Sequence, residues 1–150
     1  MSWSRYLFSS RGRLTRAKYW FAAIVFLLVM AAAVMLALMA PTALPSWSLL
    51  PAGLELVIGL AFLAVCYSSI VIAIKRLHDR NKSGWWVLIF FGLPSVLPQL
   101  ADPARPAVTL VLNGASFVLS LWALVELGFL RGTRGPNRFG PDPLESGAHP

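Results

Sequence analysis

The sequence has few charged residues and a single cysteine. Charged residues make up 13% of its 150 residues and hydrophobic residues 57%, whereas a soluble domain carries about 25% and 45–50%. This charge is too sparse to coat a water-facing surface, which argues against a soluble or disordered chain. Cys66 alone excludes a disulfide framework and a cysteine-rich zinc module. The composition indicates a membrane-embedded protein, and the length indicates one compact unit.

Long stretches of the chain carry no charge at all. Four uncharged runs lie at residues 19–54, 56–74, 83–101 and 106–125. A hydrocarbon core about 30 Å thick requires about 20 apolar residues in a helix, and a barrel would instead alternate apolar and polar residues. We therefore expect an all-α integral membrane protein with four transmembrane helices in a small antiparallel bundle. The expected domain covers residues 1–143, with spans near residues 19–40, 54–74, 85–100 and 107–130 and a flexible tail at residues 144–150.

The third segment is the least regular of the four. Gly92, Pro94 and Pro98 interrupt it, and proline removes a backbone donor and kinks a helix. We expect a kinked helix there, or an irregular last turn that is covered by protein. Three spans with one re-entrant segment is the alternative arrangement.

Basic residues fall on one side of the expected topology. Twelve of the 13 precede the first span, join the second span to the third, or follow the fourth, and only Arg105 lies on the other side. Short loops rich in lysine and arginine stay in the cytoplasm, so both termini are expected there. This topology accounts for the net charge of +7. Since no nucleic-acid-binding motif accompanies the charge, we expect no nucleic-acid partner.

Three polar segments come together at this end because the connections are short. They are the leader (residues 11–20), the loop (residues 75–86) and the tail (residues 132–143). The leader begins Arg-Gly-Arg and ends Tyr-Trp, the loop contains Arg-Leu-His-Asp and ends Ser-Gly-Trp-Trp, and the tail contains Gly-Pro-Asn-Arg-Phe-Gly-Pro-Asp. In this order they resemble the bacterial inner-membrane family known as domain of unknown function 805, the YhaH-like proteins, across residues 5–143. The resemblance implies a multi-span protein of the bacterial inner (plasma) membrane and no established activity.

The chain departs from this family pattern at two places. Arg80-Asn81-Lys82 stands where the family usually has Thr-Gly-Arg, and Asn is the residue besides glycine that best tolerates a left-handed backbone. Phe139 stands where tyrosine is frequent, which argues against an essential phenol hydroxyl at that position.

His78 and Asp79 in the loop are the candidates for chemistry. An imidazole can carry protons and a neighbouring carboxylate can orient it or share a metal. Adjacent residues on a helix do not face each other, however, and Asp79 can instead neutralise Arg76 or Lys82 while His78 caps or packs at the interface. A metal site needs three or four ligands, so we expect neither a metal nor another cofactor. The structural interpretation is favoured, with ligand binding and catalysis left as alternatives.

The tail is richer in turn-forming residues than the end of a span requires. Its Gly and Pro residues favour tight, defined turns. We expect residues 132–143 to fold back on the loop, with Arg138 near Asp79 and Asp142 near a cation of the loop, because the charges on this face match.

These features favour a non-enzymatic membrane protein whose basic, aromatic cytoplasmic face binds a partner protein or anionic lipid. A second copy of the chain, in a homo-oligomer, is a further candidate partner. A small transporter or channel subunit acting as an oligomer is the first alternative, and a head-group-modifying membrane enzyme using His78 and Asp79 is the second. The expected binding residues are Arg13, Arg16, Lys75, Arg76, His78, Asp79, Trp85, Trp86, Asn137, Arg138 and Asp142.

Overall fold

The computed structural model describes residues 6–7, 9–43 and 50–145. Within them the regular structure is helical apart from one isolated bridge between Asn137 and Gly140. The α-helices are α2 (Arg16–Ala43), α3 (Leu50–Asp79), α4 (Leu93–Val96) and α5 (Pro106–Leu124). The π-helical segments η1 (Leu88–Gly92) and η3 (Val125–Phe129) and the 3-10 segment η2 (Leu97–Leu100) extend them. Most of the predicted flexible tail, residues 146–150, lies outside the described residues.

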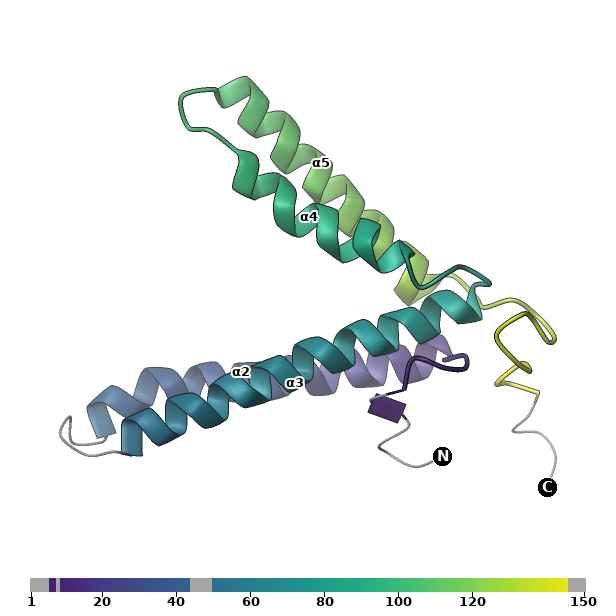
Figure 1. Cartoon of the computed structure of the whole chain (residues 1–150), viewed down its shortest axis with the longest axis horizontal. Helices are drawn as coiled ribbons and strands as arrows, with labels where there is room; N and C mark the ends of the chain where they lie inside the picture. The colour runs from purple at the N-terminus through teal and green to yellow at the C-terminus, as the bar shows by residue number, and fades with distance from the viewer. Residues whose placement is uncertain (1–5, 8, 44–49, 146–150) are drawn as a thin grey trace.

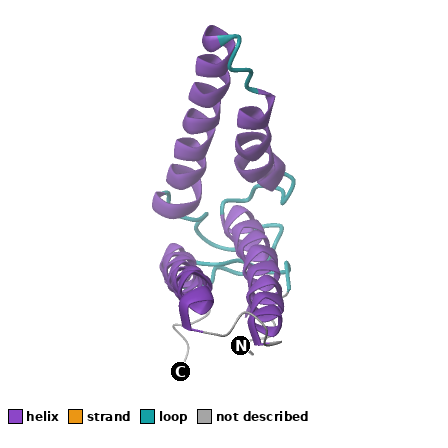
Figure 2. Ribbon diagram, turned by 90° about the vertical axis from the view of Figure 1, so that its left-hand side faces the viewer, coloured by secondary structure: helices purple, strands orange, loops and turns teal. Residues whose placement is uncertain are grey.

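The helices form two antiparallel hairpins that diverge from one shared end. One hairpin pairs α2 with α3, and the other pairs the short helices around α4 with α5 (Figure 1). They meet where η3 packs against α2 and α3, and their far ends separate (Figure 1, Figure 2). This open arrangement differs from the small antiparallel bundle that the sequence predicted. Lipid tails are as apolar as leucine, so no hydrophobic force closes such helices on one another, and Leu27 and Leu110 stay 69% and 75% exposed.

Three helical stretches are long and apolar enough to cross a membrane, Arg16–Met39, Gly53–Asp79 and Pro106–Phe129. The sequence predicted another near residues 85–100, where the apolar helix Leu88–Leu100 is shorter. At 1.5 Å per residue it is about 20 Å long, against about 30 Å of hydrocarbon. The third segment is therefore helical, as predicted, but too short to cross the full core unaided.

Proline explains the irregular backbone of this third segment. Pro98 has no N–H to donate to the carbonyl of Pro94, one helical turn earlier. The hydroxyl of Ser116 in α5 donates to that carbonyl at 2.8 Å. The bond satisfies a backbone oxygen that the proline leaves without its helical donor, and it ties the two arms of the second hairpin together.

The apolar core lies at the shared end rather than along the hairpins. One cluster comes from α3, η1, α5, η3 and Val87, and a second joins the leader to α2 and α3. The buried members are Ala73, Leu77, Val87, Phe90, Ala123 and Leu127 in the first and Leu14, Ala22 and Ile72 in the second. Apolar side chains that are buried against one another therefore hold the two hairpins together at one end only.

Asn81 lies two residues after the end of α3, at the start of the polar connection to the third segment. Its φ of 57° is left-handed, the conformation that the sequence predicted Asn to tolerate here. The N–H of Lys82 donates to the carbonyl of Leu77 at 2.8 Å, the six-to-one bond of a Schellman cap. This cap redirects the chain so that the loop faces the tail.

Candidate functional site

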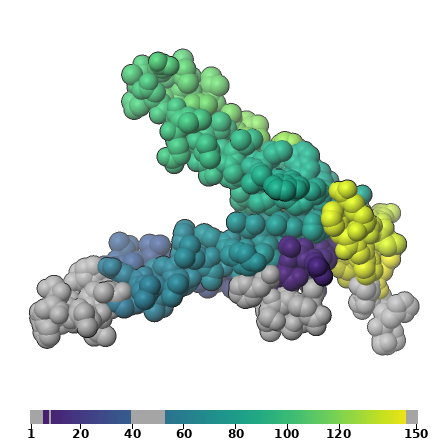
Figure 3. Space-filling view, in the orientation of Figure 1, coloured from purple at the N-terminus to yellow at the C-terminus, as the bar shows by residue number. Residues whose placement is uncertain are grey.

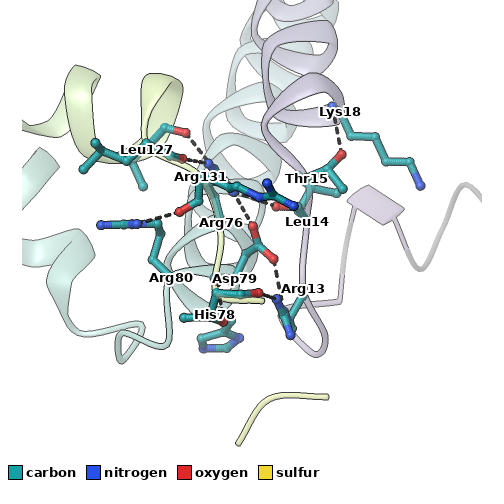
Figure 4. Close-up of polar contacts among 12 residues, drawn as sticks. Arg13, Leu14, Thr15, Lys18, Arg76, His78, Asp79, Arg80, Leu127 and Arg131 are labelled. Atoms are coloured by element: carbon teal, nitrogen blue, oxygen red, sulfur yellow. Dashed lines mark hydrogen bonds and ion pairs between the residues drawn. The ribbon is translucent and has the colours of Figure 1, made fainter. Parts of the chain in front are cut away.

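Six charged side chains meet at the shared end and form what we call the polar junction. Arg13 comes from the leader, Arg76 and Asp79 from α3, and Arg80 from the turn after α3 (Figure 4). Lys82 comes from the same turn and Glu126 from η3. The members are Arg13, Arg76, Asp79, Arg80, Lys82 and Glu126. Burial of a charge is costly unless it is paired and hydrogen-bonded. The stability of the junction therefore depends on the geometry of these pairs.

Asp79 accepts hydrogen bonds from two guanidinium groups. Nε of Arg13 lies 3.1 Å from Oδ1, and Nη1 of Arg76 donates to Oδ2. The Asp79 side chain is 5% exposed and both arginine side chains are 1% exposed. Asp79 thus joins the leader to α3, and the prediction that it neutralises Arg76 is confirmed.

Glu126 makes the second buried pairing of the junction. Its Oε1 lies 3.0 Å from Nε of Arg80 and 2.9 Å from Nζ of Lys82. The Lys82 ammonium also lies 4.7 Å from the centre of the Trp86 ring, within the range of a cation–π contact. Lys82 therefore pairs with Glu126 rather than with Asp79.

Arg76 and Arg80 also hold the backbone where the chain leaves η3. Arg76 donates from Nε to the carbonyl of Leu127 at 2.8 Å and from Nη2 to that of Leu130. Arg80 donates from Nη1 to the carbonyl of Arg131 at 2.5 Å. The last carbonyls of a helix lack intrahelical partners and carry partial negative charge. The buried Arg76 at the end of α3 and the half-buried Arg80 just after it supply these partners and join the two hairpins.

Arg13 holds the tail in the same way. Its Nη2 donates to the carbonyl of Thr133 at 2.5 Å, and its Nη1 donates to that of Gly135 at 2.6 Å. The guanidinium fork is rigid and has five donors, so one side chain can bind a carboxylate and several carbonyls at once. Arg13 therefore connects the leader, α3 and the tail.

The tail folds back on the loop, as the sequence predicted. The N–H of Thr133 donates to the carbonyl of Asp79 at 2.8 Å, and Nδ2 of Asn137 donates to that of His78 at 3.0 Å. The Phe139 ring stacks on the His78 ring with centroids 3.8 Å apart and planes 6° apart. The polar contacts satisfy the end of α3, and the ring stack covers one side of the imidazole.

The predicted charge pairs of the tail were wrong. Arg138 donates to the carbonyl of Asn81 at 2.9 Å, because Asp79 is already enclosed by other guanidinium groups. Asp142 accepts N–H bonds within the tail, from Gly135 at 3.1 Å and from Leu144 at 3.0 Å. Each charge binds backbone instead of the opposite charge that the sequence suggested.

The carboxyl of Asp142 has a pKa below its ordinary value. The backbone N–H of Leu144 is the largest cause, burial opposes it, and the N–H of Gly135 and the charges of Arg13 and Arg131 add to the lowering. Each of these favourable contacts stabilises the ionised form. Asp142 is therefore charged at neutral pH and fixes the turns of the tail.

His78 and Asp79 do not form a joint site. The imidazole points away from the Asp79 carboxylate (Figure 4), and the buried Nδ1 of His78 has no hydrogen-bond partner among the described residues. Those residues also contain no cluster of three or more side chains suited to a metal. His78 and Asp79 therefore do not act as the pair that the enzyme alternative named.

The eleven predicted binding residues divide by exposure. Lys75 is fully buried and donates to the carbonyl of Tyr6 at 2.8 Å. Five of the eleven are buried: Arg13, Lys75, Arg76, Asp79 and Asp142. Three are half-buried: His78, Trp86 and Asn137. Arg16, Trp85 and Arg138 are exposed. Most of the motif residues therefore bind other parts of this chain.

Three charged members of the junction were not among the predicted binding residues. Arg80, Lys82 and Glu126 form one cluster, in which the half-buried cations pair with the buried carboxylate. The available signal was Glu126, an acid that follows 20 uncharged residues near the end of the fourth apolar run. Such a residue needs a cation nearby, and the loop is the nearest source.

Comparison with known proteins gives a family but no activity. Residues 7–141 match the family described as protein of unknown function (DUF805). The chain is 28% identical to the uncharacterized protein YiiR of Escherichia coli K12, over 95% of this chain and 90% of that protein, and equally similar to YiiR of Escherichia coli O157:H7. No solved structure matches the chain.

Proposed function

This chain belongs to the DUF805 family of proteins of unknown function, and from that premise we propose that it is a bacterial inner-membrane protein whose cytoplasmic end binds anionic phospholipids. The polar junction then serves as the internal frame of that end. Basic side chains around the junction supply the lipid-binding surface.

The distribution of charge supports this orientation. The leader and the tail lie together at the shared end of the hairpins (Figure 1, Figure 3). The sequence segments that lead to this end carry 12 of the 13 basic residues. Arg105 lies in the connection before α5, at the opposite end of that hairpin. Positively charged segments stay on the cytoplasmic side, which supports a cytoplasmic location for the shared end.

The observation that carries the proposal is a set of basic side chains left over after the junction is built. In the junction itself, four cations face two carboxylates. Six further basic residues at this end are exposed, and none of them forms an ion pair with any described residue. They are Arg11, Arg16, Lys18, Arg131, Arg134 and Arg138.

Such residues bind a negatively charged leaflet. Each juxtamembrane lysine or arginine contributes about 1 kcal/mol near an anionic lipid surface. Trp20 marks the depth of this surface, because tryptophan concentrates at the membrane–water interface. Its Nε1 donates to the carbonyl of Gly128 at 3.0 Å, so the ends of both hairpins lie at the same depth.

The test is the lipid that accompanies the protein. The full chain is extracted in mild detergent, and its bound phospholipids are compared with those of the whole membrane. We expect enrichment of anionic species, and its loss when the six exposed residues are changed to Gln. Arg105→Gln at the opposite end is the control and should keep the enrichment. Bound lipid of the same composition as the membrane would overturn the proposal.

A further inference from the structure

A cavity of about 220 Å³ opens beside the polar junction. The first turn of α2 forms one wall, α3 forms the floor, and two stretches of the tail region form the opposite wall. The lining residues are Thr15, Arg16, Ala17, Arg76, Asp79, Arg131, Gly132, Thr133, Asp142, Pro143 and Leu144. A water molecule occupies about 30 Å³ of liquid, so the cavity has room for a polyatomic ion.

Arg16 and Arg131 are the uncommitted charges in this lining. Both side chains are exposed, and neither forms a hydrogen bond or ion pair with a described residue. The two side chains therefore offer guanidinium donors from both sides of the cavity.

The carboxylates in the lining are already satisfied. Asp79 binds Arg13 and Arg76, and Asp142 accepts two N–H bonds from its own tail. Including Arg13 behind the wall, four guanidinium groups surround two carboxylates. The cavity thus carries an excess of about two positive charges, a count that follows from these pairings and favours an anion.

The start of α2 adds to this preference. Thr15 caps the helix, and its Oγ1 accepts from the N–H of Lys18 at 3.4 Å. The N–H groups of Arg16 and Ala17 precede the first intrahelical bond, which runs from Tyr19 to Thr15. Free N–H groups and the helix dipole at such a start favour negative charge.

We infer that this cavity binds the phosphate group of an anionic lipid head group, with Arg16 and Arg131 as its two guanidinium ligands. The inference rests on the proposed function and gives that binding a defined site. Arginine forks match phosphate oxygens well. Trp20 lies one helical turn beyond the cavity, which sets the cavity at head-group depth. Free phosphate shares the same chemistry, so the experiment separates these two sources.

The experiment titrates the detergent-purified full chain with phosphatidic acid, phosphatidylglycerol or phosphatidylcholine and counts bound lipids by native mass spectrometry. Inorganic phosphate is added in a parallel thermal-unfolding series. The test variant is Arg16→Gln/Arg131→Gln. The comparison variant is Arg11→Gln/Arg134→Gln, which removes two charges of the same basic surface from exposed positions outside the lining.

The expected result is one tight anionic lipid per chain, with its affinity about thirtyfold weaker in the test variant and weakened clearly less in the comparison variant. Equal melting temperatures of both variants and the unchanged protein would show that folding is intact. Equal weakening in both variants would overturn the site while leaving the proposed function standing. No preference for anionic lipid would overturn both. Stabilisation by inorganic phosphate equal to that by lipid would overturn the lipid assignment.

Discussion

Gly132 packs directly against the carboxylate of Asp79. A Cβ on Gly132 would lie 2.0 Å from Oδ2 of Asp79 and 2.5 Å from its Cγ. Immediately afterwards, the N–H and the hydroxyl of Thr133 both donate to the backbone carbonyl of Asp79, at 2.8 and 3.1 Å. The chain therefore crosses over a buried, doubly paired carboxylate at the point where the tail begins, and only glycine leaves room for that crossing.

Gly132→Ala should destabilise the shared end strongly. The methyl group requires movement of a carboxylate that two arginines hold, and overpacking of a filled site costs about 1–3 kcal/mol. We expect a lower melting temperature in detergent, measured by the loss of helical circular dichroism.

Gly114→Ala is the matched control for this change. No heavy atom lies within 4 Å of the Cβ position at Gly114 in α5, and alanine favours a helix over glycine by about 1 kcal/mol. Its melting temperature should be equal or higher. Equal losses in the two variants would refute the close packing at Gly132.

Asp79→Asn should be among the most damaging single changes at this end. It leaves Arg13 and Arg76 buried beside a neutral side chain, and removal of one partner from a buried pair costs about 3–5 kcal/mol. Arg138→Gln removes an exposed bond to a carbonyl and should cost less than about 1 kcal/mol. Chemical denaturation of each variant in the same detergent measures both changes.

A double-mutant cycle between Asp79→Asn and Arg13→Gln gives the pairwise energy. Because these side chains touch, the two losses should be clearly less than additive. The cycle between Asp79→Asn and Arg138→Gln should be additive. Coupling in the second cycle, with none in the first, would contradict the pairing described here.

Phe139→Ala should loosen the tail without unfolding the hairpins. The change removes the ring stack on His78, which is worth about 1 kcal/mol beyond its buried area. Trypsin should then cut faster at the exposed residues Arg134 and Arg138. Phe139→Tyr keeps the ring and should behave like the unchanged protein, and faster cutting of the tyrosine variant would show that the stack does not hold the tail.

The contribution of Asp142 to stability should disappear in acid. Its pKa is lowered in the folded chain by N–H bonds and nearby arginines. The charged form is therefore favoured in the folded state above the unfolded pKa of about 3.9, and this stabilisation is lost as the pH falls through the folded pKa. The melting temperature of the unchanged protein should exceed that of Asp142→Asn at pH 6, and the gap should close as the pH falls through the lowered pKa of Asp142. A gap that persists at low pH would exclude this cause.

The sequence predicted the features that depend on a residue's own neighbours. Helices follow from apolar runs long enough to bury their backbone in lipid, and Asn81 takes the left-handed conformation expected of it. Family membership and the return of the tail onto the loop were also predictable, because three motifs in fixed order fall at one end of a short-looped topology.

The sequence could not predict which groups would pair across that end. Arg138 and Asp79 carry opposite charges, yet Asp79 binds Arg13, 66 positions away, and Arg138 binds backbone. These pairings depend on the direction in which the unpaired carbonyls of η3 point and on the contact between Gly132 and Asp79. Neither is encoded in local periodicity, because both arise only after the two hairpins have met.

The helical segments, their one-sided charge and the gathering of the motifs at one end therefore follow from the sequence, because hydropathy and charge act segment by segment. The tertiary structure alone decided that the hairpins diverge and that most motif residues turn inward. The physical reason is that a buried guanidinium group must satisfy its donors with whatever acceptors lie within about 3 Å. At this end of the molecule those acceptors are the carbonyls and carboxylates of segments far away in the chain.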